Sequence, residues 1–571
     1  MKKIISLFII MGLLGPLSAN TLPIIEYASV NHPTIDDDGM VVSQRKIASE
    51  VGAQILKKGG NAIDAAVATG LALAVVLPRA GNLGGGGFMI VHLAKENKTI
   101  AIDYREKAPS AADRDLFLDE NGDYDKKKAQ FSLLSAGVPG SVAGFHHALT
   151  KYGTITWQEA LEPAIKLAEQ GFEIPHDLAN TLASERYRKR LSSNPAAAKV
   201  FFKKDKSIYS AGETLVQTDL AWTLKQLSKN GPDAFYKGEI AKLIVQEMEA
   251  NGGLITLEDL KNYNVAERKP LVGQYKNFEI VSMPPSSSGG THLIQMLNML
   301  EEFPIKEMGF GSADSIHILA EVMKRAYADR SKYLGDSDFY KVPSSLTSKD
   351  YAKALNKDIS VEEITPSSEV APGNPYPYES PDTTHFSVMD QYGNAVSNTY
   401  TLNFSYGSGM MIPGTGMLIN NEMDDFSSKP GTPNGYGLLG SEANAIEPNK
   451  RPLSSMTPTI IFKDNEPYMV FGSPGGSRII TTVLQVAMNV MEHDMNIAQA
   501  VHSPRMHHQW LPEVLMIEQG FGVDTENLLK QKGYRLYPSS TMGSVQAIMK
   551  KGNYFYGSAD PRRPSAGVAT P

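Results

Sequence analysis

Helical periodicity dominates the first half of the chain. Residues 40–76 carry apolar side chains at helical spacing, and Ala65–Val76 is apolar almost throughout, so this stretch is predicted to be helical. Residues 140–260 have the same character, interrupted by glycine, proline and asparagine breaks. Another helix is expected after the serine- and glycine-rich turn at 284–290. These patterns indicate a large helical component.

Strand patterns occur between these predicted helices and are the main pattern after residue 382. Runs rich in valine, threonine and aromatic residues predict strands at 383–390 and 395–402. Shorter apolar runs predict strands at 88–92 and 278–283. The chain is therefore expected to mix helices with strands.

The strands at 383–390 and 395–402 fit a tight hairpin. The three-residue loop between them ends in Gly393, the position where such loops favour glycine. Asp390 then pairs with Asn394, and the same register sets Thr383 opposite Thr401. Asn403 lies just beyond the hairpin. The register therefore places a second hydroxyl beside the first residue of the strand.

Four consecutive glycines, Gly84–Gly87, precede the strand at 88–92. A nucleotide-binding loop would need a following Lys-Ser/Thr or the GxGxxG spacing, and both are missing here. The run is interpreted instead as allowing close backbone packing at the start of a buried strand.

A proline-rich stretch at 361–382 is the clearest internal boundary. It holds five prolines in 22 residues and has little periodicity, so it is expected to be extended and poorly packed. It stops at Thr383, where the strand pattern begins. Such a boundary is a suitable place for chain processing.

The first 19 residues read as an export signal. Lys2 and Lys3 precede the apolar run Ile4–Leu17, and Leu17-Ser18-Ala19 resembles a signal-peptidase site. The run is shorter than the ~20 residues that a membrane span needs. A mature chain beginning at Asn20 is expected, exported to a bacterial periplasm or secreted, with no membrane anchor.

The charge and the cysteine content of the chain exclude several classes of function. The net charge is −7 and no basic stripe occurs, which argues against nucleic acid as a partner. There is no cysteine, so disulfides and a thiol nucleophile are excluded. Neither a cofactor nor a metal site is predicted.

Thr383 can act as a nucleophile if it becomes a chain terminus. A threonine hydroxyl needs a base, and an α-amine has a pKa of about 7.7–8.0, suited to accept its proton. Thr401 could then orient the hydroxyl by a hydrogen bond. Taken alone, both residues are better explained as ordinary β-strand threonines.

The chain resembles the γ-glutamyltransferase family of the N-terminal-nucleophile hydrolase class over nearly all of its mature length. The matching motifs are Gly81–Phe88, Asp103–Pro109, Gly137–Ser141, Thr383–Val388, Gly393–Val396, Asn420–Phe426, Pro452–Met456 and Gly472–Arg478. The resemblance implies an α+β fold, a four-layer αββα sandwich. It also implies self-cleavage between Asp382 and Thr383 into a large subunit (20–382) and a small subunit (383–571), paired as a heterodimer. The resemblance does not determine whether two such heterodimers associate into a larger dimer.

The resemblance also assigns roles in the transfer of a γ-glutamyl group from glutathione, glutamine or a related amide. Thr383 and Thr401 are implied in catalysis, with the N–H groups of Gly475 and Gly476 as the oxyanion hole. The implied substrate-binding residues are Arg105, Ser454 and Ser455 for the α-carboxylate, Asn403, Glu422 and Asp425 for the α-ammonium, and Tyr436 in a lid loop at 430–441. The final acceptor is water, an amino acid or a dipeptide.

Two alternatives stay open at this point. An acylase of the same fold would remove a glutaryl-type group from a β-lactam and would need no ammonium pocket. A non-catalytic exported protein could bind peptides or amino acids on the same scaffold. The paired acids Glu422 and Asp425 argue against the first alternative, and an intact Thr383 argues against the second.

Overall fold

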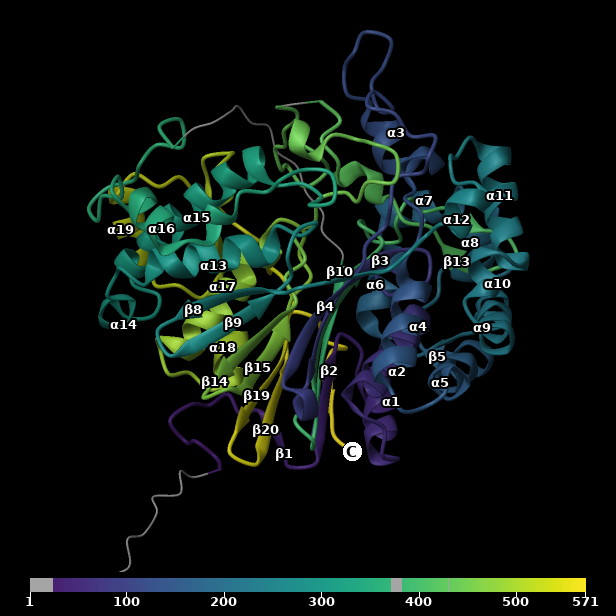
Figure 1. Cartoon of the computed structure of the whole chain (residues 1–571), viewed down its shortest axis with the longest axis horizontal. Helices are drawn as coiled ribbons and strands as arrows, with labels where there is room; N and C mark the ends of the chain where they lie inside the picture. The colour runs from purple at the N-terminus through teal and green to yellow at the C-terminus, as the bar shows by residue number, and fades with distance from the viewer. Residues whose placement is uncertain (1–23, 371–382, 430) are drawn as a thin grey trace, which may run out of the picture.

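Two seven-stranded antiparallel sheets face each other at the centre of the protein, with helices on both outer sides (Figure 1). The structure is a computed structural model that describes residues 24–370, 383–429 and 431–571. The expected α+β fold with four αββα layers is confirmed. The predicted signal at 1–19 lies outside the described residues. No helix in the described part of the chain has the length and apolar character of a membrane span.

The sheet that contains β10, named here the β10 sheet, has its strands in an order far from the chain order. They are, across the sheet, β21 (Gly567–Ala569), β2 (Gly39–Ser43), β10 (Thr383–Asp390), β11 (Ala395–Thr401), β3 (Gly86–Leu93), β4 (Lys98–Tyr104) and β7 (Ala266–Arg268). The strand after the proline-rich boundary therefore lies in the middle of the sheet.

The facing sheet is named the β15 sheet. Its strands are, in order, β1 (Thr34–Asp36), β20 (Tyr554–Ala559), β19 (Gln546–Lys551), β15 (Glu466–Gly472), β14 (Thr459–Lys463), β9 (Phe278–Ser282) and β8 (Leu271–Tyr275). Short strands outside the two sheets are β5 (Phe172–Glu173), β6 (Thr214–Leu215), β12 (Met411–Ile412), β13 (Met417–Leu418), β16 (Met506–His507), β17 (Leu515–Ile517) and β18 (Leu536–Pro538).

Helices cover the outer faces of both sheets and extend the β10 side. The helices on the β10 side are α1 (Lys46–Lys57), α2 (Ala62–Val76), α4 (Ser141–Tyr152), α5 (Trp157–Gln170), α6 (His176–Ala183), α7 (Glu185–Ser192), α8 (Pro195–Phe201), α9 (Thr218–Asn230), α10 (Asp233–Tyr236) and α11 (Glu239–Asn251). Those on the β15 side are α13 (Gly289–Leu300), α14 (Ile305–Met308), α15 (Ala313–Tyr333), α16 (Lys349–Asn356), α17 (Arg478–Met491), α18 (Ile497–His502) and α19 (Val523–Gln531). The short α3 (Lys126–Phe131) and α12 (Leu257–Lys261) join loops.

The prediction of one helix over residues 40–76 is wrong at its start. Residues 39–43 form β2, whose side chains alternate: Met40 and Val42 belong to the core between the sheets, and Val41 to the core beneath the helices. Five residues are too few for periodicity to separate strand from helix. The helical part is also broken, because Asn61 caps α2 through a capping box with Asp64.

The hairpin register is confirmed. Thr383 pairs with Thr401 across β10 and β11, and Gly393 in the loop has a φ of +88°. The N–H of Asp390 donates to the carbonyl of Asn394 at 3.1 Å, as the loop type requires.

The interpretation of the glycine run is also confirmed. A β-carbon on Gly85 would lie 2.0 Å from the carbonyl oxygen of Thr401, and one on Gly87 would lie 2.5 Å from that of Thr399. Each position therefore excludes a side chain because another backbone passes directly beside it.

The proline-rich boundary is better packed than expected over its first part. Ser367 is buried, and its side chain donates to the carbonyl of Trp510 at 2.8 Å while the Trp510 ring nitrogen donates back at 2.9 Å. The N–H of Ser367 donates to Glu513 at 2.7 Å. Residues 371–382, including the predicted cleavage residue Asp382, lie outside the described residues.

Candidate active site

The ends of four neighbouring strands of the β10 sheet meet near Thr383. Because neighbouring strands are antiparallel, β10 begins where β11 ends at Thr401, where β3 begins at Gly86 and where β4 ends at Tyr104. The residues that follow β4 and β11 therefore start beside Thr383. This topology brings Arg105, more than 270 positions away along the chain, to the same end of the sheet.

The two threonine hydroxyls lie together in a buried environment. Thr383 Oγ1 is 3.5 Å from Thr401 Oγ1, and both residues are almost fully buried. The N–H of Asn403 donates to the Thr401 hydroxyl oxygen at 2.7 Å. Asn82 was not singled out from the sequence, yet its side chain bonds the Thr401 carbonyl at 2.9 Å and so helps to hold this strand end.

The glycine pair after β15 reaches the same end of the molecule. A β-carbon on Gly472 would lie 2.5 Å from the ring of His385, so the end of β15 packs against the beginning of β10. Gly475 and Gly476 have φ values of +144° and +54°. These conformations strongly favour glycine and turn the backbone sharply before α17 begins at Arg478.

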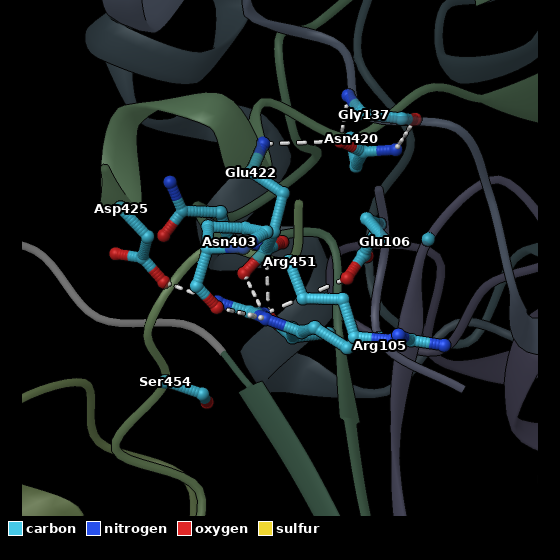
Figure 2. A network of polar contacts seen from close by, with 12 residues as sticks. Arg105, Glu106, Gly137, Asn403, Asn420, Glu422, Asp425, Arg451 and Ser454 are labelled. Carbon is cyan, nitrogen blue, oxygen red and sulfur yellow. Dashed lines mark hydrogen bonds and ion pairs between the residues drawn. The ribbon is translucent and has the colours of Figure 1, made fainter. Parts of the chain in front are cut away.

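Arg105 is the centre of a buried ion cluster (Figure 2). Its guanidinium donates one hydrogen bond to Glu422 and another, at 2.5 Å, to Asp425, and lies 3.6 Å from Glu106. A further bond of 3.2 Å to the carbonyl of Pro452 fixes its plane. The cation and the acids that were assigned to opposite ends of a substrate are thus paired with one another.

Burial and charge shift the pKa values in this cluster in opposite directions. Burial raises the pKa of Glu106 to about 7 and that of Glu422 well above its ordinary value, although Arg105 opposes both shifts. The pKa of Asp425 rises for the same reason. Burial alone would lower the pKa of Arg105, but its acidic neighbours outweigh this effect and raise it.

The cluster also contains buried acceptor atoms that other groups leave unused. Glu422 Oε2 and Asn403 Oδ1 have no hydrogen-bond partner among the residues that the structure describes. Asn403 has a φ of +73°, which asparagine tolerates better than most residues, and its amide nitrogen is fixed by the carbonyl of Asn421 at 2.8 Å. Buried acceptors without a donor are costly, so they mark a place where a donor group can bind.

The two predicted serines lie near this cluster but are held by different partners. Ser454 accepts from the N–H of Met456 at 3.1 Å, and Ser455 accepts from Arg330 at 3.1 Å. Arg330 could not be recognised from the sequence pattern, because it lies on α15 among ordinary helical residues. Its buried guanidinium adds a second cation beside the serines.

The segment from 431 to 441 covers the cluster. Tyr436 donates from its hydroxyl to the carbonyl of Asn403 at 2.7 Å, and the Asn434 amide donates to Asp425 at 3.3 Å. Pro430, the first residue of the predicted lid, lies outside the described residues. The segment predicted to be a lid is therefore tied to the cluster through the backbone of Asn403, whose N–H also holds Thr401.

The protein is an αββα sandwich in which a threonine begins a central strand. This architecture places it in the class of N-terminal-nucleophile hydrolases. A family model described as gamma-glutamyltranspeptidase matches residues 48–570. The chain is 53% identical over 535 residues to a glutathione hydrolase proenzyme of Escherichia coli, with 93% of this chain and 92% of that protein covered. The chain belongs to the gamma-glutamyltranspeptidase family.

Solved structures agree with this assignment. A cephalosporin acylase from Bacillus halodurans has a TM-score of 0.84 at 26% identity, with 98% of this chain and 99% of that chain covered. The Helicobacter pylori gamma-glutamyltranspeptidase has a TM-score of 0.58 at 49% identity, with 59% of this chain and 96% of that chain covered. The fold is thus shared between transpeptidases and acylases, and the site must decide between these activities.

Proposed function

We propose that the protein is a self-processing γ-glutamyltransferase and glutathione hydrolase, exported from the cell and active as a heterodimer of its two fragments. It moves the γ-glutamyl group of glutathione, glutamine or a related amide to Thr383, and then to water or to the amine of an amino acid or dipeptide. The observation that carries this proposal is the buried cluster in which one arginine lies between two acids beside the threonine pair.

Self-cleavage comes first in this proposal. The Thr383 hydroxyl attacks the carbonyl carbon of Asp382, the C–N bond breaks, and the nitrogen of Thr383 leaves with a proton as a free amine. Water then hydrolyses the resulting ester, which regenerates the hydroxyl and gives Asp382 a terminal carboxyl group. The products are the fragments 20–382 and 383–571.

The new α-amine supplies the base that the continuous chain lacks. It accepts the proton of the Thr383 hydroxyl as the oxygen attacks the γ-carbonyl, and passes the proton to the leaving amine. Thr401 orients the attacking hydroxyl. The N–H groups of Gly475 and Gly476 stabilise the oxyanion, a contribution of about 3–4 kcal/mol for each donor in comparable enzymes.

When the donor binds, its two charges replace the contacts that Arg105 makes with Glu422 and Asp425. Its α-carboxylate accepts hydrogen bonds from the planar guanidinium of Arg105, with Ser454 and Ser455 as further donors. Its α-ammonium has three hydrogens to donate, and Glu422, Asp425 and the unused Oδ1 of Asn403 can accept them. Each charge of a γ-glutamyl group thus meets its opposite, which supports an amino acid donor over an acyl group that lacks the ammonium.

A pair of substrates that differ only in the ammonium tests this assignment. The γ-glutamyl and glutaryl amides of one aniline carry the same scissile bond, but the glutaryl compound would leave the acceptors of Asn403 and Glu422 unpaired. We expect kcat/KM to be at least about 100-fold higher for the γ-glutamyl amide. Equal or faster cleavage of the glutaryl amide would make the protein an acylase.

The lid makes a separate prediction. Tyr436→Phe removes the bond to the Asn403 carbonyl while keeping the ring, and should lower kcat/KM for a γ-glutamyl anilide about three- to tenfold. Tyr392→Phe, in the exposed hairpin loop, is the matched control and should have no effect. Steady-state kinetics on both variants decide, and equal values would show that this bond does not hold the lid.

A further inference from the structure

Asp424 is a buried carboxylate that connects two distant segments of the chain. Its Oδ1 atom accepts hydrogen bonds from the Tyr124 hydroxyl at 2.7 Å and from the Gln130 amide at 3.2 Å. Its Oδ2 atom accepts from the N–H of Gly435 at 3.0 Å. Asp424 therefore joins α3 and the loop before it to residues 431–441, which we call the lid segment.

The contact between Asp424 and the lid segment is close and specific. A buried carboxylate is costly, and here three uncharged donors offset that cost. A β-carbon on Gly435 would lie 2.4 Å from Asp424 Oδ2 and 2.4 Å from the ring of Phe404. Only a residue without a side chain lets the backbone approach the carboxylate in this way. The contact therefore depends on both partners, the acid and the glycine.

The glycine that this carboxylate binds lies between the two lid residues that reach the site. On one side of it, Asn434 donates to Asp425 at 3.3 Å. On the other side, Tyr436 donates to the carbonyl of Asn403 at 2.7 Å. Both side chains thus extend from backbone that the carboxylate holds.

The other partners of Asp424 are themselves held in place. Asp125 caps α3 by accepting from two backbone N–H groups at 2.9 and 3.1 Å. The Gln130 carbonyl accepts from the side-chain amide of Asn421 at 3.1 Å, and Tyr124 packs against a small apolar core. These residues therefore give the lid segment a fixed point of attachment.

We propose that Asp424 anchors the lid segment and is a positioning residue for the donor. It acts through Gly435, which holds Asn434 and Tyr436 over the donor pocket, and it does not touch the substrate. Its effect on the substrate rests on the proposed function, whereas the anchoring itself does not. Loss of the anchor should free the lid segment and weaken donor binding, with little effect on the reacting atoms at Thr383.

Asp424→Asn tests the anchor. Asparagine has the same shape but only one acceptor oxygen, so in either orientation its NH₂ group faces a donor on one side. Hydrogen exchange is measured by mass spectrometry at about pH 8.5, where Asp424 is ionised because burial raises its pKa to about 7. Peptides from the lid segment should exchange about tenfold faster than in the parent. KM for a γ-glutamyl anilide should rise about fivefold while kcat stays nearly unchanged.

Tyr124→Phe is a milder variant, because the Gln130 amide still donates to the same oxygen. It should give about threefold faster exchange in the lid segment, and it decides the question if Asp424→Asn does not fold. Asp115→Asn is the matched control, because Asp115 is exposed in the loop before α3, and its lid segment should exchange as in the parent.

Two results would overturn the inference: lid exchange equal to the parent's in the variants that fold, or faster exchange spread evenly over the chain. The proposed function would fail in a different way. The parent would then release no aniline from the γ-glutamyl anilide, while the lid segment would still exchange faster in Asp424→Asn.

Discussion

Replacing Thr383 by alanine is expected to leave the chain uncut and to lower γ-glutamyl transfer at least ~10⁴-fold. The same hydroxyl performs both reactions, first on the bond that precedes it and then on the substrate. This hydroxyl is buried and lies 3.5 Å from that of Thr401, which we expect to orient it for attack. Denaturing electrophoresis and mass spectrometry of the small fragment, which should begin at Thr383, measure the first reaction, and release of aniline from a γ-glutamyl anilide measures the second.

Thr384→Val is the control for this experiment. Thr384 is equally buried and has the same shape as valine, and its hydroxyl has no hydrogen-bond partner among the described residues. Removing an unpaired buried hydroxyl costs little or is stabilising, so this variant should still cut itself and turn over. Two fragments from a Thr383→Ala chain would show that another group, or a contaminating protease, makes the cut.

Local patterns predicted the part of the fold that depends on near neighbours. The hairpin loop at Gly393 fixed the register, and the register alone placed Thr401 opposite Thr383. The glycines at 84–87 were interpreted correctly because a side chain is excluded there by backbone contact. Both inferences use rules that act over a few residues.

Patterns failed where tertiary context decides the structure. Residues 39–43 form a strand because they lie between β10 and β21, and their alternating burial is too short to read as a period of two. The segment around Ser367 was expected to be poorly packed because of its prolines, but Trp510 and Glu513, distant in sequence, bind it.

The candidate site also combines features that local patterns predict with features that depend on the tertiary fold. Motif resemblance indicated which residues should gather, but the direct pairing of Arg105 with Glu422 and Asp425 spans more than 300 positions and follows from no spacing. Asn82 and Arg330 went unnoticed because each resembles an ordinary loop or helix residue. Asn82 holds Thr401 and Arg330 holds Ser455, two residues of the proposed site, and such support becomes visible only in the folded structure.

Replacing Arg105 by glutamine should lower kcat/KM for γ-glutamyl donors about 100- to 1000-fold, mainly through KM. The change removes the fork that we propose binds the α-carboxylate, and it leaves three acids, Glu106, Glu422 and Asp425, without their cation. Breaking a buried ion pair in this way costs about 3 kcal/mol of folding stability. Arg105→Lys keeps the charge but not the planar fork, so it should recover stability more than binding.

The pH dependence of unfolding separates this account from a general packing defect. The acids already have raised pKa values, about 7 for Glu106, and losing Arg105 raises them further. A folded carboxyl group with a raised pKa binds its proton more tightly than the unfolded chain does, so its stabilising contribution exists at low pH and is lost as pH rises from about 4.5 through the folded pKa. The deficit in Tm of Arg105→Gln against the parent should therefore widen between pH 5 and pH 8 (on the order of several degrees).

Arg114→Gln, which breaks an exposed pair with Glu442, should show a small deficit that does not depend on pH in this way. A deficit for Arg105→Gln that stays constant with pH would mean that the acids find other partners and that Arg105 does not hold their charge.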